Sequence, residues 1–370
     1  MGAGNAVVFK PSELAPASEA LLADLIARYL DPAAIKVVRG GVAQATALLD
    51  QRFDVIMYTG GPAVARAVMA KAARHLTPVL LELGGKNPVI VDASADLDLA
   101  ASAIVRGRFV NCGQMCIAPE YVLVEASVEE ALLERLRAAT ARMFGADPRA
   151  SSSYGRMVNA RHWKRVMGLL EGAGGTCITG ERGQGSDAGA LYIPPTIIRE
   201  PSQGAPLWGE EVFGPVLATR RVASVEEAIG IVNAGDKPLC LYMFSGSPSA
   251  IASVLGRTSS GGVTVNDTLL HMTNSELPFG GVGVSGMGAY HGKHGFEAFS
   301  HRKPVHRAYS WFNVIGLFMN PPYYVGQERV LGLVLRYVPT HLLPMSIRDS
   351  LLVGLVAAVV GMGLRLTGRI

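Results

Sequence analysis

The feature that most constrains this chain is an alternation of short apolar runs and helical patterns over residues 1–83, with glycines at the turns. The runs predict strands at 6–9, 35–38, 54–61 and 78–83, and helices at 18–30, 43–50 and 63–74 between them. We expect Ser18 to cap the first helix. Strands that alternate with helices form parallel sheets, which bind ligands at the carboxyl ends of their strands. The pattern predicts an α/β fold with a ligand site at the carboxyl ends of these strands.

The alternation continues more loosely as far as residue 267. Further strands are predicted at 89–92, 121–126, 218–222, 241–245 and 261–267, and further helices at 128–144 and from Ser224. A glycine-rich stretch, 172–189, predicts a surface loop or hairpin. We therefore expect a second α/β unit after the first.

Composition excludes several classes of protein. The chain has 370 residues, 49% of them hydrophobic, and a net charge of +4, which argues against disorder. Four cysteines are too few for a disulfide scaffold, and the amino terminus lacks the features of a signal peptide, so a cytoplasmic protein is expected. Residues 301–370 hold eight Lys or Arg and two acidic residues. Their net charge of +6 exceeds the +4 of the whole chain. Because the rest is slightly acidic, no nucleic-acid partner is expected.

The tail combines this positive charge with apolar runs. Residues 351–364 carry no charge, but 14 residues are fewer than the ~20 that a spanning helix needs. The span would reach Ile370 if Arg365 extended toward the interface, and 330–335 could lie in the interface itself. The alternative is a helix packed on the body of the protein. We expect the tail to associate with a membrane surface.

Three motifs are judged weak. Residues 281–286 match G-x-G-x-x-G, but no clear strand precedes them and no βαβ unit follows. Gly84-Gly85-Lys86 lacks the spacing of a P-loop. The histidines at 291, 294, 301 and 306 are interleaved with Lys and Arg, which would repel a cation, so no metal site is expected.

Cys116 and Glu82 are the stronger candidates for chemistry. Cys116 lies in a turn bounded by Gly113 and Pro119, where a thiol is either a small buried apolar group or a nucleophile. Glu82 interrupts an apolar strand at the predicted ligand end, where burial would raise its pKa toward the range useful for activating water. The alternative for Glu82 is an edge-strand carboxylate paired with a surface lysine.

Considered together, seven segments resemble the aldehyde dehydrogenase family, in its class 3 branch of fatty-aldehyde and coniferyl-aldehyde enzymes. They follow the family's order along the chain: NAVVFKPSE (5–13), HLTPVLLELGGKNP (75–88), NCGQMCIAPEYVLV (111–124), EEVFGPVL (210–217), KPLCLYMFS (237–245), SSGGVTVND (259–267) and LPFGGVGVSGMGAYHGKHGFEAFSHRK (277–303). The resemblance implies an aldehyde dehydrogenase fold, with a partial Rossmann-like NAD(P) domain, an α/β catalytic domain and a small oligomerisation arm.

The resemblance also assigns an activity and its residues. It implies that a hydrophobic aldehyde is oxidised to its carboxylic acid with NAD or NADP as cofactor. Cys116 matches the nucleophile that forms a thiohemiacetal and then a thioester, and Glu82 matches the base that activates water. The positions that match cofactor-binding residues are Lys10 and Glu13 for the adenosine ribose, Gly60 beneath the pyrophosphate, and Glu211 and Phe213 for the nicotinamide ribose.

On this basis we divide the chain into four parts. Residues 1–83 are expected to form the partial NAD(P)-binding domain, 84–275 the catalytic domain, 276–310 an oligomerisation or return segment, and 311–370 the apolar, basic tail. The expected partners are a small aldehyde substrate, a second copy of the chain in a homodimer, and a membrane surface at the tail.

Two departures from the family pattern stand out. The turn after the third strand has Gly61 and Pro62 where the family usually has Ser and Thr, and Pro62 lacks an N–H for a phosphate, although proline is tolerated at the first helical position. The family's first Rossmann strand and an asparagine that helps stabilise the oxyanion have no counterpart, so we expect the sequence to be incomplete at its amino terminus. A catalytically impaired remnant and a cysteine esterase that works without nicotinamide are the alternative functions.

Overall fold

The computed structural model describes residues 1–305, 307, 321, 328–329 and 332. The chain divides into two units, Met1–His301 and Arg302–Ile370, and all the elements below belong to the first. The fold is α/β, as predicted, and its strands form three sheets.

The largest sheet has seven strands in the order β11-β10-β5-β6-β9-β8-β7. Its strands are β5 (Pro88–Val91), β6 (Tyr121–Glu125), β7 (Thr176–Cys177), β8 (Thr196–Arg199), β9 (Val216–Val222), β10 (Cys240–Phe244) and β11 (Gly262–Val265). All neighbours are parallel except β7 and β8, which are antiparallel. The glycine-rich stretch 172–189 contains β7 and is otherwise mostly turns and loop, in line with the predicted surface loop.

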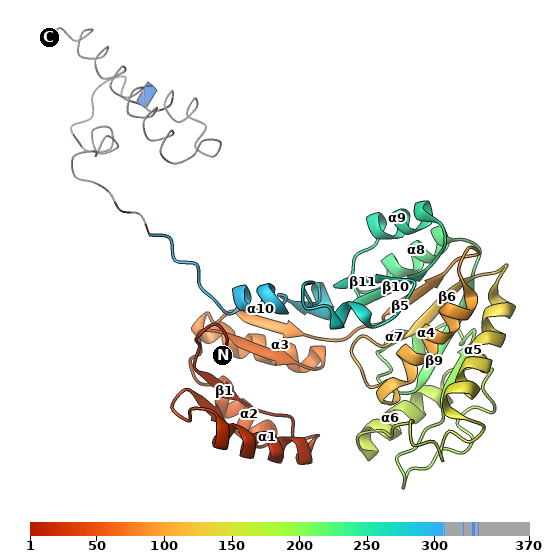
Figure 1. The fold of residues 1–370 in the computed structure, drawn as a ribbon, viewed down its shortest axis with the longest axis horizontal. Coiled ribbons are helices and arrows are strands. Elements are labelled where there is room, and N and C mark those ends of the chain that lie inside the picture. The colour runs from red at the N-terminus through yellow and green to blue at the C-terminus, as the bar shows by residue number, and fades with distance from the viewer. Residues whose placement is uncertain (306, 308–320, 322–327, 330–331, 333–370) are drawn as a thin grey trace. The chain divides into compact units, whose positions relative to one another are not determined.

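Helices cover both faces of this sheet (Figure 1). They are α4 (Leu97–Phe109), α5 (Glu129–Phe144), α6 (Ala160–Glu171), α7 (Pro206–Gly209), α8 (Val225–Ala234) and α9 (Pro248–Arg257). The order of the strands reverses between β5 and β10, and right-handed crossovers therefore place α4 and α5 on one face and α8 and α9 on the other. Every residue of β5 and β10 is buried, which explains their continuous apolar sequences.

The amino-terminal part forms two smaller sheets. One pairs β1 (Val7–Phe9) with β2 (Ile35–Val37), and the other has the order β12-β4-β3. The bounds of its three strands are Ile56–Thr59 for β3, Val79–Glu82 for β4 and Gly286–Met287 for β12. The helices of the first unit outside the large sheet are α1 (Pro16–Tyr29), α2 (Val42–Leu49), α3 (Pro62–Ala72) and α10 (Gly292–Ala298). The predicted alternation of strands and helices is thus confirmed.

The prediction that Ser18 caps the first helix is wrong. Helix α1 begins at Pro16, because the fixed φ of proline suits the first helical position, and Ser18 lies within its first turn. Ser224 does cap α8 as predicted, since its side chain accepts a hydrogen bond from the Glu227 N–H. The apolar side chains of α1 are largely exposed, with Leu21 at 57% and Tyr29 at 76%.

The predicted apolar tail segments, 330–335 and 351–364, lie outside the described residues, apart from Gly332. Among the residues that the structure does describe, no helix is both long enough and apolar enough to cross a membrane. Association of the tail with a membrane stays a prediction.

Candidate active site

The site is built around a turn between α4 and β6. Asn111, Cys112 and Gly113 have φ values of 51°, 55° and 72°, a run of left-handed residues that bends the chain sharply. A Cβ at position 113 would lie 2.2 Å from the carbonyl oxygen of Gly214, so only glycine fits there. The bend directs the following residues to the amino end of the large sheet, where Cys116 lies just before β6.

Cys116 is partly buried, whereas Cys112 is fully buried in the core. Burial, and then the negative charges of Glu211 and Glu82, raise the pKa of the Cys116 thiol to about 11. The backbone N–H groups of Cys116 and Ile117 act in the opposite direction and lower the pKa. Both carboxylates therefore lie close to this thiol, and two peptide groups favour its ionised form.

Glu82 ends β4, the middle strand of its sheet, and pairs in register with Gly286 of β12 and Thr59 of β3. Its residue is 3% exposed, and within the described part of the chain neither carboxylate oxygen has a hydrogen-bond partner. Burial raises the pKa of Glu82 to about 7. The alternative of an edge-strand carboxylate paired with a lysine is wrong, because β4 is not an edge strand and the carboxylate is unpaired.

Glu211 lies in the loop before β9. Burial, and then the charge of Glu120, raise the pKa of Glu211 to about 7. Its Oε1 atom has no partner among the described residues, and a Cβ at Gly84 would lie 2.1 Å from that oxygen. An unpartnered acceptor beside a glycine can accept a hydrogen bond from a ligand hydroxyl, which the predicted ribose contact of Glu211 requires. Phe213, two residues later, has a left-handed backbone with φ 44°.

The loop that carries Glu211 is held by a buried ionic group. Glu120 accepts hydrogen bonds from Lys86 Nζ at 2.8 Å, from Arg108 Nη1 at 2.7 Å and from the Val212 N–H at 2.8 Å. Burial acts to raise the pKa of Glu120, but Lys86 and Arg108 together outweigh it and hold the pKa below its usual value. Sequence reasoning missed this group, because nothing in the pattern links positions so far apart.

The remaining predicted cofactor residues follow the ends of β1 and β3. Lys10 Nζ contacts Glu13 at 3.1 Å and donates to the carbonyl oxygens of Pro11 and Gly40. The Gly60 N–H donates to the Glu82 carbonyl at 2.9 Å, so the predicted pyrophosphate turn adjoins the predicted base. The structure thus joins Lys10 to Glu13 and Gly60 to Glu82. Pro62 is the first residue of α3, as the tolerance for proline there predicts.

The weak G-x-G-x-x-G motif forms a closed turn. The Val282 N–H donates to Ser285 Oγ at 2.9 Å, and Gly286 pairs with Glu82 in the antiparallel β12–β4 contact. The loop therefore lies along one edge of β4, where the Ser285 carbonyl also accepts a hydrogen bond from the Leu83 N–H at 3.1 Å.

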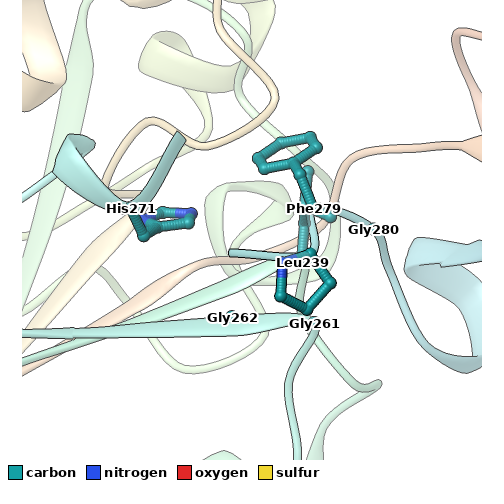
Figure 2. A pocket seen from close by; sticks show the side chains of 7 residues that line it. Leu239, Gly261, Gly262, His271, Phe279 and Gly280 are labelled. Atoms are coloured by element: carbon teal, nitrogen blue, oxygen red, sulfur yellow. The ribbon is translucent and has the colours of Figure 1, made fainter. Parts of the chain in front are cut away.

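A small hollow of about 10 Å³ lies beside the start of β11, with His271 and Phe279 among its lining residues (Figure 2). It is no larger than the space that one water molecule needs, and far too small for an organic ligand. The Nε2 atom of His271 lies 2.9 Å from Cys240 Sγ, and its Nδ1 atom lies 2.8 Å from Thr264 Oγ1. Burial raises the pKa of Cys240 and lowers the pKa of His271, so this pair is uncharged at neutral pH.

The model of the aldehyde dehydrogenase family matches residues 1–305 of the chain. Among curated proteins, the chain is 47% identical over 304 residues to aldehyde dehydrogenase family 3 member A2 of Rattus norvegicus, covering 82% of this chain and 62% of that protein. It is 48% identical over 307 residues to the dimeric NADP-preferring aldehyde dehydrogenase of the same organism, covering 82% and 66%. The chain thus spans less than two thirds of the length of these relatives.

A solved structure of AldH from Staphylococcus aureus, described as its substrate-bound state, is also similar. It matches with a TM-score of 0.81 at 36% identity, over 90% of this chain and 71% of that one. The likeness therefore extends over the fold as well as the sequence.

Proposed function

The chain belongs to the aldehyde dehydrogenase family, and we propose that its site serves the NAD(P)-dependent oxidation of a hydrophobic aldehyde to the corresponding carboxylic acid. The observation that carries this proposal is that the charges of two carboxylates act on Cys116: Glu82, which is buried and has no partner on either oxygen, and Glu211, whose Oε1 atom has none, among the described residues. A thiol nucleophile and a carboxylate base close together are what acyl transfer through a thioester requires.

In the first stage, the Cys116 thiolate attacks the aldehyde carbon and forms a thiohemiacetal. The N–H groups of Cys116 and Ile117 support the thiolate, which burial and the nearby carboxylates disfavour. A bound nicotinamide dinucleotide would accept the hydride that leaves this carbon. The hydroxyl proton of the thiohemiacetal is lost in the same stage, which leaves a thioester on Cys116.

In the second stage, Glu82 takes a proton from water, which attacks the thioester carbon and releases the acid and the free thiol. With a pKa of about 7, Glu82 is partly ionised at neutral pH, so it can both accept this proton and release it. Because neither oxygen has a hydrogen-bond partner among the described residues, both remain free to accept a hydrogen bond from water.

The cofactor role is proposed for residues in two places. Glu211 would accept hydrogen bonds from the nicotinamide ribose, beside Phe213, while Lys10 and Glu13 would hold the adenosine ribose and Gly60 would underlie the pyrophosphate. The unpartnered Oε1 atom of Glu211 and the Lys10–Glu13 pair support this proposal. The name of the dimeric, NADP-preferring relative favours NADP over NAD as the first cofactor to test.

We extend the proposal to domains and partners. Residues 1–83 would bind the dinucleotide, 84–275 would hold the nucleophile, and 276–310 would complete the assembly. A homodimer is proposed because a similar protein is named as dimeric.

The test is aldehyde-dependent formation of NADPH or NADH, followed by absorbance, on a medium-chain aldehyde. Cys116→Ala should abolish turnover, and Cys112→Ala, a matched change at a fully buried cysteine, should retain most of it. Glu82→Gln should give a burst of reduced cofactor followed by slow turnover, because hydride transfer precedes the water step. Equal loss from the two cysteine variants would contradict the assignment. Hydrolysis of an ester by the protein, without any aldehyde oxidation, would instead favour the esterase.

A further inference from the structure

Buried side chains hold three consecutive carbonyl groups, the first of which belongs to the proposed nucleophile, Cys116. Asn87 Nδ2 donates to the carbonyl oxygen of Cys116 at 2.8 Å and to that of Ala118 at 3.0 Å. Tyr242 Oη donates to the carbonyl between them, on Ile117, at 2.6 Å. The direction of every peptide in this short segment is therefore set from outside the turn.

Asn87 is itself fixed on all sides. It is 0% exposed, its Oδ1 atom accepts from the Cys240 N–H at 2.9 Å, and its own carbonyl accepts from the Glu120 N–H at 2.9 Å. These contacts join the amino ends of β5, β6 and β10, which are neighbours in the sheet. The carboxamide thus cannot rotate without breaking hydrogen bonds in a site closed to water, which is costly.

The planarity of the peptide bond converts this anchoring into an effect on the thiol. The carbonyl of Cys116 and the N–H of Ile117 belong to one rigid unit and point in opposite directions. When Asn87 holds the oxygen, the Ile117 N–H is turned away from Asn87. That N–H is one of the two that interact with the Cys116 sulfur.

We propose that Asn87 is a positioning residue that turns the Cys116–Ile117 peptide so that its N–H group faces the reacting sulfur. The side chain does not touch substrate in this role and acts only through the peptide that it orients. The inference rests on the proposed function in that it takes Cys116 as the reacting thiol. Neither the sequence pattern nor the family resemblance pointed to Asn87.

Other titratable groups also affect the pKa of the Cys116 thiol, so a test has to compare proteins in which those groups are the same. The titratable groups that face Cys116 come from β4, the loop before β9, β10 and the segment after β12: Glu82, Glu211, Cys240, Tyr242 and Tyr290. A change at Asn87 removes none of these groups and alters no charge.

The experiment measures alkylation of Cys116 by iodoacetamide between pH 7 and 9.5, with mass spectrometry to identify the labelled cysteine. No cofactor or aldehyde is needed. In Asn87→Leu, which has a similar size but no donor, Cys116 should react about tenfold more slowly at pH 8.5, as expected for one pKa unit less thiolate. Asn87→Ser keeps one hydroxyl donor in place of two amide hydrogens, leaves a small cavity rather than a clash, and should give an intermediate rate.

The control is Thr268→Val, which removes another fully buried hydrogen bond, from Thr268 Oγ1 to the Ala103 carbonyl at 2.7 Å. It should lower the melting temperature without slowing the alkylation of Cys116. A purely structural role for Asn87 would loosen the turn and leave the rate unchanged or increase it. Either result in folded Asn87→Leu or Asn87→Ser would overturn the inference.

The two proposals can fail separately. If the protein oxidises aldehydes through Cys116 but Cys116 in the Asn87 variants is alkylated at the wild-type rate, the proposed function stands and this inference fails. If the protein oxidises no aldehyde but Cys116 in the Asn87 variants is alkylated slowly, the proposed function fails and the positioning role of Asn87 stands.

Discussion

Arg108 and Glu120 form an ion pair of 2.7 Å from which water is almost excluded, with side chains 0% and 2% exposed. Arg108 also donates to the carbonyls of Pro119 and Gly214. Because Glu120 in turn accepts from the Val212 N–H, the pair connects α4 with the loop that carries Glu211. One buried charge pair thus couples the stability of the large sheet to the proposed cofactor site.

We predict that Arg108→Met destabilises the protein by about 3–5 kcal/mol, the usual loss when one partner of a buried pair is removed. The variant leaves Glu120 with Lys86 and takes donors from two buried carbonyls. Denaturant unfolding would measure the change. Arg28→Met, which removes an exposed pair with Asp24, should change stability little. A similar loss from both variants would contradict this account.

Glu82→Gln should stabilise the protein more at pH 8 than at pH 5. The folded protein keeps the Glu82 proton up to about pH 7, whereas the unfolded chain releases it near the ordinary glutamate pKa of 4.5. Between these values the unfolded state binds fewer protons, so stability falls as pH rises. Glutamine cannot ionise and escapes this loss. Thermal unfolding of both proteins at the two pH values checks the prediction, and an equal difference at both would refute it.

Gly84→Ala should weaken nicotinamide cofactor binding by about tenfold or more, in keeping with the roughly 1.5–3 kcal/mol of a hydrogen bond to a charged group. The added Cβ would lie 2.1 Å from Glu211 Oε1 and would displace a flexible carboxylate rather than backbone. Titration calorimetry with NADP and with NAD measures the effect. Gly209→Ala is the matched control, because a Cβ there meets nothing within 4 Å. If Gly84→Ala binds the cofactor with unchanged affinity, the proposed contact between Glu211 and the cofactor is wrong.

The strands could be predicted because their apolar runs are short and bounded by glycine or proline, and β3, β4 and β5 appear within two residues of their predicted limits. The burial of Glu82 followed from a carboxylate inside such a run. Helix α4 was missed although Asp96 caps it, because its residues are buried on several sides and show no clear apolar stripe.

Other features depend on contacts that no local pattern contains. Asn87 and Glu120 are single polar residues between strands, and their roles come from partners on β10, α4 and the loop before β9. The left-handed run at 111–113, which positions Cys116, could not be predicted either, since only Gly113 indicates it in the sequence. Resemblance to a family suggested the reacting groups that we propose, but the groups that support them became visible only in three dimensions.

The placement of β4 between β3 and β12 has a consequence for biosynthesis. Strand β12 follows β4 in the chain only after the whole seven-stranded sheet. During translation, the large sheet and its thiol can therefore form while one edge of β4 is still open, and Glu82 gains its second strand neighbour only when Gly286 has left the ribosome. The growing chain thus acquires its proposed nucleophile before it encloses its proposed base.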